Sequence, residues 1–188
     1  ISTFPYSLKD FLLEGTQQVS ASWITLENLS FPYCISINSS YIYEQSTDER
    51  INQNDAAITL AHELGHYLGL RHVFSEGGTT SMCTDTDYCK DTPSYNRSEY
   101  EQWLNNLDKQ KKYQLKDLAK RYSCEKGEYE AHNIMDYAYC FYNEITLEQR
   151  KRIRHILNYS PLIPGPKESR IDTRGVQDRL NLPICIMK

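Results

Sequence analysis

The stretch that decides the fold runs from His62 to His72 and reads HELGHYLGLRH. It places three imidazoles and one carboxylate in the order H-E-x-x-H-x-x-G-x-x-H. On a helix, His62 and His66 stand one turn apart on the same face, close enough to bind one metal ion. Gly69 can take the left-handed conformation that ends a helix, so that His72 returns toward the same ion. Three neutral nitrogen ligands with an open fourth position predict a catalytic zinc site.

The length of this motif separates two interpretations. A bare HExxH also fits an amphipathic helix with two surface histidines. The longer motif favours the metal site, because three of the five histidines of the chain fall in this run at ligand spacing. Glu63 lies beside the two helical histidines without being forced to bind the metal.

Composition limits the class of protein. A chain of 188 residues predicts one domain with its own core. The net charge of -4 provides no basic footprint for nucleic acid. The sequence contains neither an apolar run long enough for a transmembrane segment nor a signal peptide. Because the chain begins at Ile1 without an initiator methionine, we expect a processed or trimmed product, and a lipid anchor on a preceding segment stays open. We also expect the protein to be a monomer.

The six cysteines indicate the compartment. They include no CxxC pair, so zinc-ribbon spacing is absent. We expect disulfides in a secreted or cell-surface protein. Six reduced thiols in a cytosolic protein are the alternative, and spacing alone leaves the pairing open.

The periodicity of apolar residues predicts the main elements. Residues 6–15 fit a short helix, 31–43 a strand, 97–122 a helix or helical pair, and 146–158 a helix that opens with a capping box. Residues 56–68 fit the metal helix, whose expected core face is Ala57, Ala61, Leu64 and Leu68. In the helix at 146–158 we expect burial of Leu147, Ile153, Ile156 and Leu157.

Two loops carry further candidate side chains. Residues 83–93, CTDTDYCKDTP, supply hard oxygen ligands of the kind that calcium prefers, although a solvated acidic loop without metal fits the composition too. Residues 132–140, HNIMDYAYC, could place Met135 beneath the histidines and point the Tyr137 phenol toward the metal. A core methionine and a packed aromatic residue are the alternatives there.

These motifs together resemble a known family. The run 62–72 is similar to the extended zinc motif of metzincin metallopeptidases, and NIMDY at 133–137 resembles their Met-turn. Within the metzincins the chain looks most like the pappalysins, because a C…D…DTP loop lies between the two motifs and a cysteine follows the second. The resemblance covers about residues 31–158.

The resemblance implies an α+β fold. A metzincin-like (zincin) catalytic domain would span residues 1–160, with an N-terminal subdomain to about 69 and a C-terminal subdomain at 70–160. A small mixed sheet would pack on the active-site helix, and the helical C-terminal subdomain would lie below the cleft. Residues 161–188 would be a tail packed on or tethered to the domain.

The resemblance also implies roles for particular residues. The zinc ligands would be His62, His66 and His72, with Glu63 as general base and acid, Met135 in the Met-turn, and Tyr137 binding the metal or stabilising the transition state. A calcium ion would be held by Asp87, the carbonyl of Lys90, and Thr92. The disulfides would be Cys83–Cys124 and Cys89–Cys140, leaving Cys34 and Cys185 as a third pair.

We therefore expect a zinc-dependent endopeptidase. Its polypeptide substrate would lie extended along the strand near residues 34–43. A zinc-stabilised binding module that no longer cleaves is the alternative from another class, and the intact Glu63 argues against it. A latent protease, with the end near Cys185 in the cleft, is a further alternative.

Overall fold

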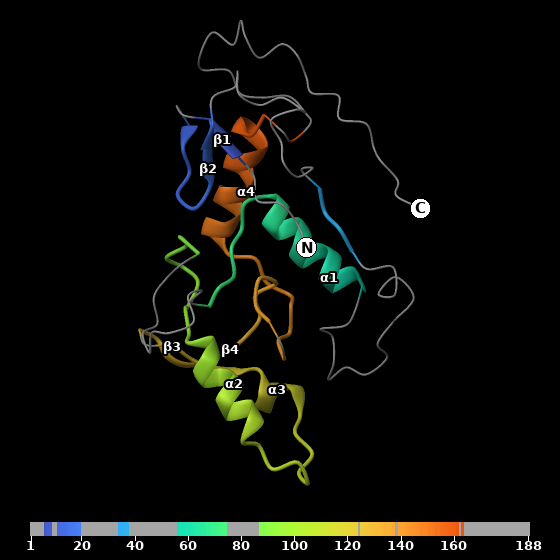
Figure 1. Cartoon of the computed structure of the whole chain (residues 1–188). Helices are drawn as coiled ribbons and strands as arrows, with labels where there is room; N and C mark the ends of the chain where they lie inside the picture. The colour runs from blue at the N-terminus through green and yellow to red at the C-terminus, as the bar shows by residue number, and fades with distance from the viewer. Residues whose placement is uncertain are drawn as a thin grey trace, which may run out of the picture.

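The computed structural model describes residues 6–8, 11–19, 34–37, 56–74, 87–123, 125–137, 139–161 and 163. Within these ranges the chain mixes helices with two small two-stranded sheets, in keeping with the α+β class (Figure 1). The elements in chain order are β1 (Tyr6–Leu8), β2 (Gln17–Val19), α1 (Ala56–Tyr67), α2 (Arg97–Asn105), α3 (Leu115–Leu118), β3 (Lys120–Ser123), β4 (Gly127–Glu130) and α4 (Leu147–Tyr159).

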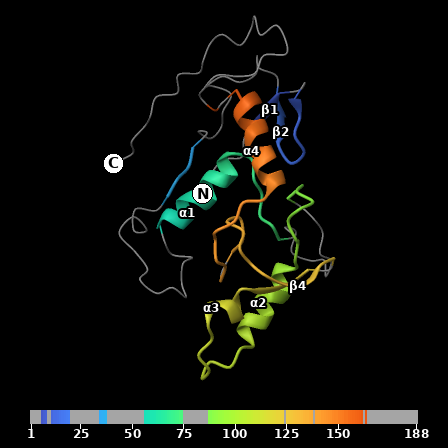
Figure 2. The same ribbon diagram turned by 180° about the vertical axis from the view of Figure 1, so that it is seen from behind.

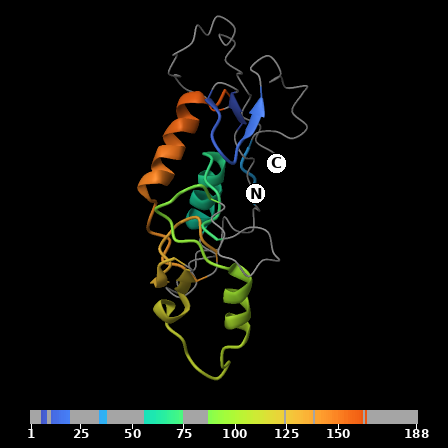
Figure 3. The same ribbon diagram turned by 90° about the vertical axis from the view of Figure 1, so that its left-hand side faces the viewer.

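The elements gather at two ends of the molecule. In all three views α1, α4 and the β1–β2 pair occupy the upper part, whereas α2, α3 and the β3–β4 hairpin occupy the lower part (Figures 1, 2 and 3). The segment between β4 and α4, drawn in orange, lies between these two groups (Figure 1). This segment contains the NIMDY motif, so the fold brings the motif to the middle of the molecule.

The first described segment is wrongly predicted as a helix. Its residues form β1, which pairs in parallel with β2, with Tyr6 opposite Gln17. The segment between the strands packs on α4, where the Phe11 ring stacks on Tyr159 with centroids 4.2 Å apart. A short isolated helix is marginal in water, so these long-range contacts outweigh the local preference.

Helix α1 ends in a Schellman motif. The amide of Leu70 donates to the carbonyl of Gly65 at 2.9 Å, and the amide of Gly69 donates to the carbonyl of His66 at 2.9 Å. Gly69 has a φ of 90°, in the left-handed region that a residue with a Cβ rarely adopts. The chain therefore reverses immediately after the second histidine.

The predicted core face of α1 is wrong. The buried residues of this helix are His62, Gly65 and His66, whereas Leu64 is 43% exposed. The histidine face packs against the segment around Met135, and a helix can bury only one broad face against one neighbour. The polar face is therefore the inner one.

Residues 97–122 contain two helices and a strand. The prediction of helix up to Tyr122 is wrong, because residues 120–123 form β3 and pair antiparallel with β4. Burial alternates along β3, so Arg121 and Ser123 are buried while Tyr122 is 71% exposed. Period-two burial is the signature of a strand with one covered face.

Helix α4 begins with the predicted capping box. The Thr146 hydroxyl accepts from the Gln149 amide, and the Gln149 side chain accepts from the Thr146 amide. The expected apolar face is only partly correct, because Ile156 is buried but Leu147 and Leu157 are exposed. The structure buries two polar side chains there instead, those of Gln149 and Arg152.

Several expectations fall on residues that the structure does not describe. Most of the strand at 31–43 and the sheet expected on the active-site helix are among them, as are Cys83, Cys124, Cys185 and nearly all of the tail. Among the described helices, none is long and apolar enough to cross a membrane.

We predict that Asp91 stabilises α4 in a pH-dependent way. Its Oδ2 accepts from the Glu148 amide at 2.9 Å, in the first turn of the helix. Burial opposes ionisation of this carboxyl, but hydrogen bonds from the helix start hold its pKa below the ordinary value. The stabilisation is therefore present above the unfolded-state pKa of about 3.9 and is lost as the pH falls through the folded-state value.

Asp91→Asn should lower the free energy of unfolding at pH 7 by about 0.3–1 kcal/mol, measured by urea denaturation. The difference from wild type should shrink at pH values near 3. Asp108→Asn is the matched control, because Asp108 is exposed and its carboxylate accepts a local turn bond from the Gln110 amide. Equal losses for both variants at pH 7 would contradict the role of Asp91.

Candidate active site

Three imidazole nitrogens converge at the end of α1. The Nε2 atoms of His62 and His66 are 3.1 Å apart, those of His66 and His72 are 3.0 Å apart, and those of His62 and His72 are 3.3 Å apart. Within the described residues, these three side chains make up the one group of three or more His, Cys, Asp or Glu that could hold a metal ion. Helix α1 positions the first two, and the turn at Gly69 returns the third.

Backbone carbonyls determine which ring nitrogen faces the centre. The Nδ1 of His62 is 2.8 Å from the carbonyl oxygen of Ile134, and the Nδ1 of His66 is 2.9 Å from that of Leu70. A carbonyl can only accept, so each Nδ1 carries the proton and each Nε2 is left with a lone pair. Two lone pairs at hydrogen-bond distance with no proton between them repel, and a cation in the centre removes the repulsion.

The triangle of nitrogens has the size that zinc requires. A tetrahedral zinc ion with Zn–N distances of about 2.0–2.1 Å holds two ligand nitrogens about 3.3 Å apart. The three observed separations lie at or slightly below this value. Burial also lowers the pKa of His62, with a smaller contribution from neighbouring His66, which keeps the imidazole in the neutral form that a ligand needs.

Glu63 lies next to this centre. It is half-buried on α1, and its charge acts on His62, where it raises the pKa against the larger lowering effect of burial. The carboxylate is therefore close to the histidines and still has access to solvent. A proton acceptor at such a place can serve a water molecule bound in the site.

The turn at residues 133–137, here called the Met135 turn, lies against the histidine face of α1. Met135 is completely buried and packs with Leu70 and Val73. A Cβ placed on Gly65 would overlap the Met135 sulfur, closer than any real contact. Gly65 stands between His62 and His66, so the turn approaches α1 only because this helical position has no side chain.

The ring of Tyr137 packs among the histidines and their neighbours. Its centroid is 4.4 Å from that of His72 and 5.2 Å from that of His62. The Arg97 guanidinium lies over the same ring at 4.6 Å, and Phe74 packs at 5.1 Å. The aromatic side chain two residues beyond Met135 is therefore a wall of the histidine site.

Asn133 connects the Met135 turn to the start of α4. Its amide group exchanges hydrogen bonds with the Gln149 amide, at 2.8 and 3.1 Å, and its Oδ1 also accepts from the Met135 amide at 2.9 Å. Gln149 belongs to the capping box of α4, so one side chain serves the helix start and the turn together.

Arg152 supports the other side of the site. This buried residue of α4 donates from Nε and Nη2 to the carbonyl of Gly69 at 3.2 and 3.1 Å, and from Nη2 to the carbonyl of Glu14 at 2.8 Å. Gly69 is the turn between the second and third histidines. The guanidinium therefore holds the reversal that brings His72 back.

The loop considered for calcium is held by its own hydrogen bonds. Asp87 and Thr92 are both buried, and the Thr92 hydroxyl is 2.7 Å from Asp87 Oδ2. Asp87 Oδ1 accepts from the Cys89 amide at 2.9 Å, and the Lys90 amide donates to Glu148 Oε2 at 2.6 Å. Two of the three candidate calcium ligands are thus brought together, in a loop that is tied to α4.

The expected Cys89–Cys140 disulfide is not formed, because both residues are free thiols in the structure. Cys140 Sγ lies 3.2 Å from the carbonyl oxygen of Ala131 and 3.3 Å from that of Asn133, and so donates within its own loop. Cys89 is buried beside Asp87 in a different loop. Burial raises the pKa of each thiol to about 12, so both stay protonated near neutral pH.

Comparison with known proteins identifies the family. The model of the peptidase M43 family, described as pregnancy-associated plasma protein-A, matches residues 19–158. The chain belongs to this family. The match contains both the histidine run and the Met135 turn, and it bears out the similarity to the pappalysins.

The chain is also similar to individual proteins from other organisms. The chain is 37% identical over 108 residues to proteins named extracellular metalloprotease from Arthroderma benhamiae and Trichophyton verrucosum. The aligned residues make up 56% of this chain and 32% of each of those two relatives. The chain therefore spans about a third of the length of the curated relatives it matches. No solved structure matches the chain significantly.

Three residues around this M43 site are missing from the sequence-based predictions. Gly65 has a signal in the sequence, since a glycine inside a helix lowers helix stability and usually serves close packing. Arg121 and Arg152 have none, because each stands among other basic residues that are exposed. Only the tertiary structure distinguishes a buried arginine from its solvated neighbours.

We predict that Gly65→Ala lowers stability. Overpacking against Met135 costs about 1–3 kcal/mol, which exceeds the gain of up to about 1 kcal/mol for alanine in a helix. In a Met135→Ala background the added methyl has room, so the loss on unfolding in urea should be smaller. Gly127→Ala is the control, since nothing lies within 4 Å of its Cβ and its cost should not depend on Met135.

We also predict that Arg152→Met weakens metal binding. The substitution leaves the Gly69 carbonyl without its donors and loosens the turn that carries His72. Loss of such supporting contacts lowers metal affinity by about 10–100-fold, which competition with a zinc chelator would measure. Arg154→Met, an exposed change on the same helix, should leave the affinity unchanged, and equal affinities for both variants would refute the prediction.

Proposed function

We propose that the chain is the catalytic domain of a zinc-dependent endopeptidase. The observation that carries the proposal is the convergence of three Nε2 lone pairs beside a half-buried glutamate. Membership of the M43 family and the metalloprotease names of the relatives support it. His62, His66 and His72 would hold the ion, which supplies a Lewis acid that acidifies water and polarises a carbonyl.

Glu63 is the proposed proton carrier. Its carboxylate takes a proton from the water that attacks the scissile carbonyl carbon, and it returns that proton to the leaving nitrogen as the C–N bond breaks. Its position supports this role, because it neighbours a metal ligand on a rigid helix and keeps access to solvent. Tyr137, whose ring borders His72, would offer its phenol to the developing oxyanion.

Several finer features belong to the same proposal. The domain would have the metzincin arrangement over residues 1–160, with subdomains meeting near residue 69 and Met135 as the Met-turn residue. It would act outside the cytoplasm on an extended polypeptide, in line with the extracellular names of the relatives. Residues 34–37 lie near α1, because Cys34 is close enough to Tyr67 to add to the rise that burial causes in the pKa of that phenol. These residues would be part of the strand that the substrate pairs with.

Calcium would bind in the loop around Asp87. The close approach of Asp87 and Thr92 supports a shared oxygen site there, with the carbonyl of Lys90 as the third ligand. Calcium would compete for the Asp87 oxygens, which accept hydrogen bonds from the Cys89 amide and the Thr92 hydroxyl in this structure.

Glu63→Gln tests the enzymatic function. The variant should retain one zinc per chain by metal analysis, because the substitution leaves the three imidazoles unchanged, but its kcat on a protein substrate should fall by at least about 10²–10⁴-fold. Glu99→Gln, an exposed change on α2, is the control and should keep full activity. A Glu63→Gln variant that cleaves at the wild-type rate would refute Glu63 as the base.

A chelator experiment separates cleavage from mere binding. The zinc-loaded wild type should cut an unfolded protein substrate, and removal of the metal should stop the reaction. No chelator-sensitive cleavage, before or after removal of the residues beyond 160, would favour the binding module over the protease. Cleavage that appears only after this trimming would identify a latent form.

A further inference from the structure

A buried ion pair stands behind the Met135 turn. Arg121 comes from β3 and Asp136 from the turn, and their side chains are almost completely removed from solvent. Arg121 Nε lies 3.4 Å from Asp136 Oδ2. The hydroxyl of buried Tyr95 donates to Asp136 Oδ1 at 2.5 Å. Such a pair persists in an apolar interior only when further hydrogen bonds satisfy both partners.

Those further bonds hold the backbone of one residue, Tyr137. Its amide donates to Asp136 Oδ1 at 2.7 Å, and its carbonyl accepts from Arg121 Nη2 at 3.1 Å. The same Nη2 also donates to the carbonyl of Tyr139 at 3.0 Å. Both polar groups of the Tyr137 backbone are therefore bonded to the two partners of one ion pair.

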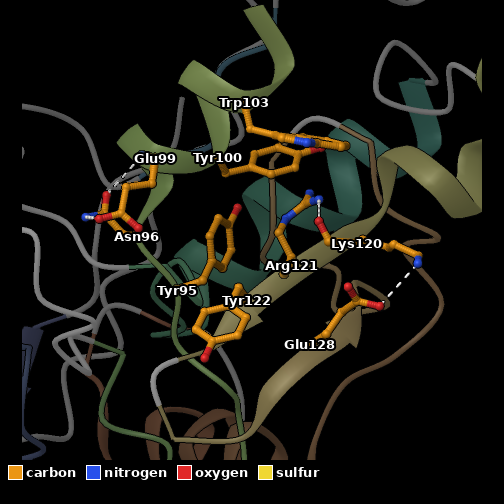
Figure 4. A pocket seen from close by; sticks show the side chains of 9 residues that line it. All are labelled: Tyr95, Asn96, Glu99, Tyr100, Trp103, Lys120, Arg121, Tyr122 and Glu128. Atoms are coloured by element: carbon orange, nitrogen blue, oxygen red, sulfur yellow. Dashed lines mark hydrogen bonds and ion pairs between the residues drawn. The ribbon is translucent and has the colours of Figure 1, made fainter. Parts of the chain in front are cut away.

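The guanidinium is itself held in place. Its plane lies over the Tyr100 ring, with Cζ 3.6 Å from the centroid, and Nη1 donates to the carbonyl of Leu118 at 3.0 Å. Figure 4 shows Arg121 on β3, with the ring of Tyr95 on one side and the tilted rings of Tyr100 and Trp103 on the other. Neither a lysine nor an apolar residue could make these planar, divergent contacts together.

We propose that Arg121, with Asp136 and Tyr95, is a positioning unit that sets the place of the Tyr137 phenol at the metal centre. The inference deepens the proposed function and rests on it. Arg121 acts by fixing the backbone from which the Tyr137 side chain reaches the histidines. A catalytic group misplaced by about 1 Å can lose about a hundredfold in rate.

The histidines are anchored at other points than the Tyr137 backbone. The carbonyl that orients His66 belongs to Leu70, outside the Met135 turn, and the carbonyl that orients His62 belongs to Ile134, three residues before Tyr137 in the turn. A change at Arg121 should therefore move the phenol more than the metal. This distinguishes a positioning role from a general contribution to stability.

A neighbouring cavity makes the test feasible. About 310 Å³ of space opens between α2 and the β3–β4 hairpin, lined by Tyr100, Trp103, Tyr122 and Arg121 among others (Figure 4). Water from this side can reach the volume that a shorter Lys side chain vacates. Arg121→Lys is thus the first variant. Tyr95→Phe, which removes the hydroxyl that donates to Asp136, is the second if the first does not fold.

The experiment is a double-mutant cycle on the zinc-loaded chain. Arg121→Lys and Tyr95→Phe are each measured alone and together with Tyr137→Phe, with kcat, KM and bound zinc as readouts. Tyr129→Phe is the matched control, because the hydroxyl that it removes comes from the same aromatic cluster and donates to the Pro93 carbonyl, outside the Met135 turn.

We expect Arg121→Lys to lower kcat by about 10–100-fold, with a smaller change in KM and one zinc per chain retained. In the Tyr137→Phe background this loss should largely disappear, because there is no phenol left to position. The inference is overturned if the loss persists undiminished in that background, or if Tyr95→Phe and Tyr129→Phe behave alike. If Tyr137→Phe alone leaves kcat unchanged, the proposed role of Tyr137 falls and the inference with it, while zinc-dependent cleavage stands.

Discussion

The structure depends on one electrostatic constraint, the approach of three imidazole nitrogens to within 3.0–3.3 Å of one another. Two of the rings donate their Nδ1 protons to backbone carbonyls, so the inward nitrogens present lone pairs that repel without a cation. Holding them together requires rigid support on every side. A helix, a left-handed turn and the Met135 turn provide that support, and buried polar side chains fix the two turns.

The supporting side chains share a pattern. Arg152 bonds the carbonyl of Gly69, Arg121 bonds that of Tyr137, and Gln149 pairs with Asn133. Each joins a secondary-structure element to an irregular loop that borders the site. Loops have unpaired backbone groups, and burial makes them costly unless a side chain completes their hydrogen bonds. Long polar side chains from α4 and β3 therefore occupy places where an apolar core residue would leave carbonyl groups unsatisfied.

The packing around α1 follows from the same constraint. The face toward the Met135 turn carries His62 and His66, and Gly65 lies between them so that Met135 can approach. A conventional amphipathic helix would turn Leu64 inward, and that expectation fails because the site occupies the inner face. Similarly, the stretch expected to remain helical through Tyr122 becomes a strand, which lets Arg121 point inward while its neighbours face solvent. In both places contacts between distant segments outweigh the local pattern.

The sequence by itself determined the convergence of the three histidines, the glycine that ends α1, the capping box of α4 and the family, because each depends on short-range spacing or on a local backbone requirement. Only the tertiary structure decided which face of α1 is buried, that β1 and β3 are strands, that Cys89 and Cys140 are free thiols, and that two arginines stand behind the site. Those outcomes depend on contacts between residues far apart in the chain. Arg121 and Arg152 resemble ordinary surface residues in the sequence, and only the carbonyl groups that meet them in the folded chain give them a role.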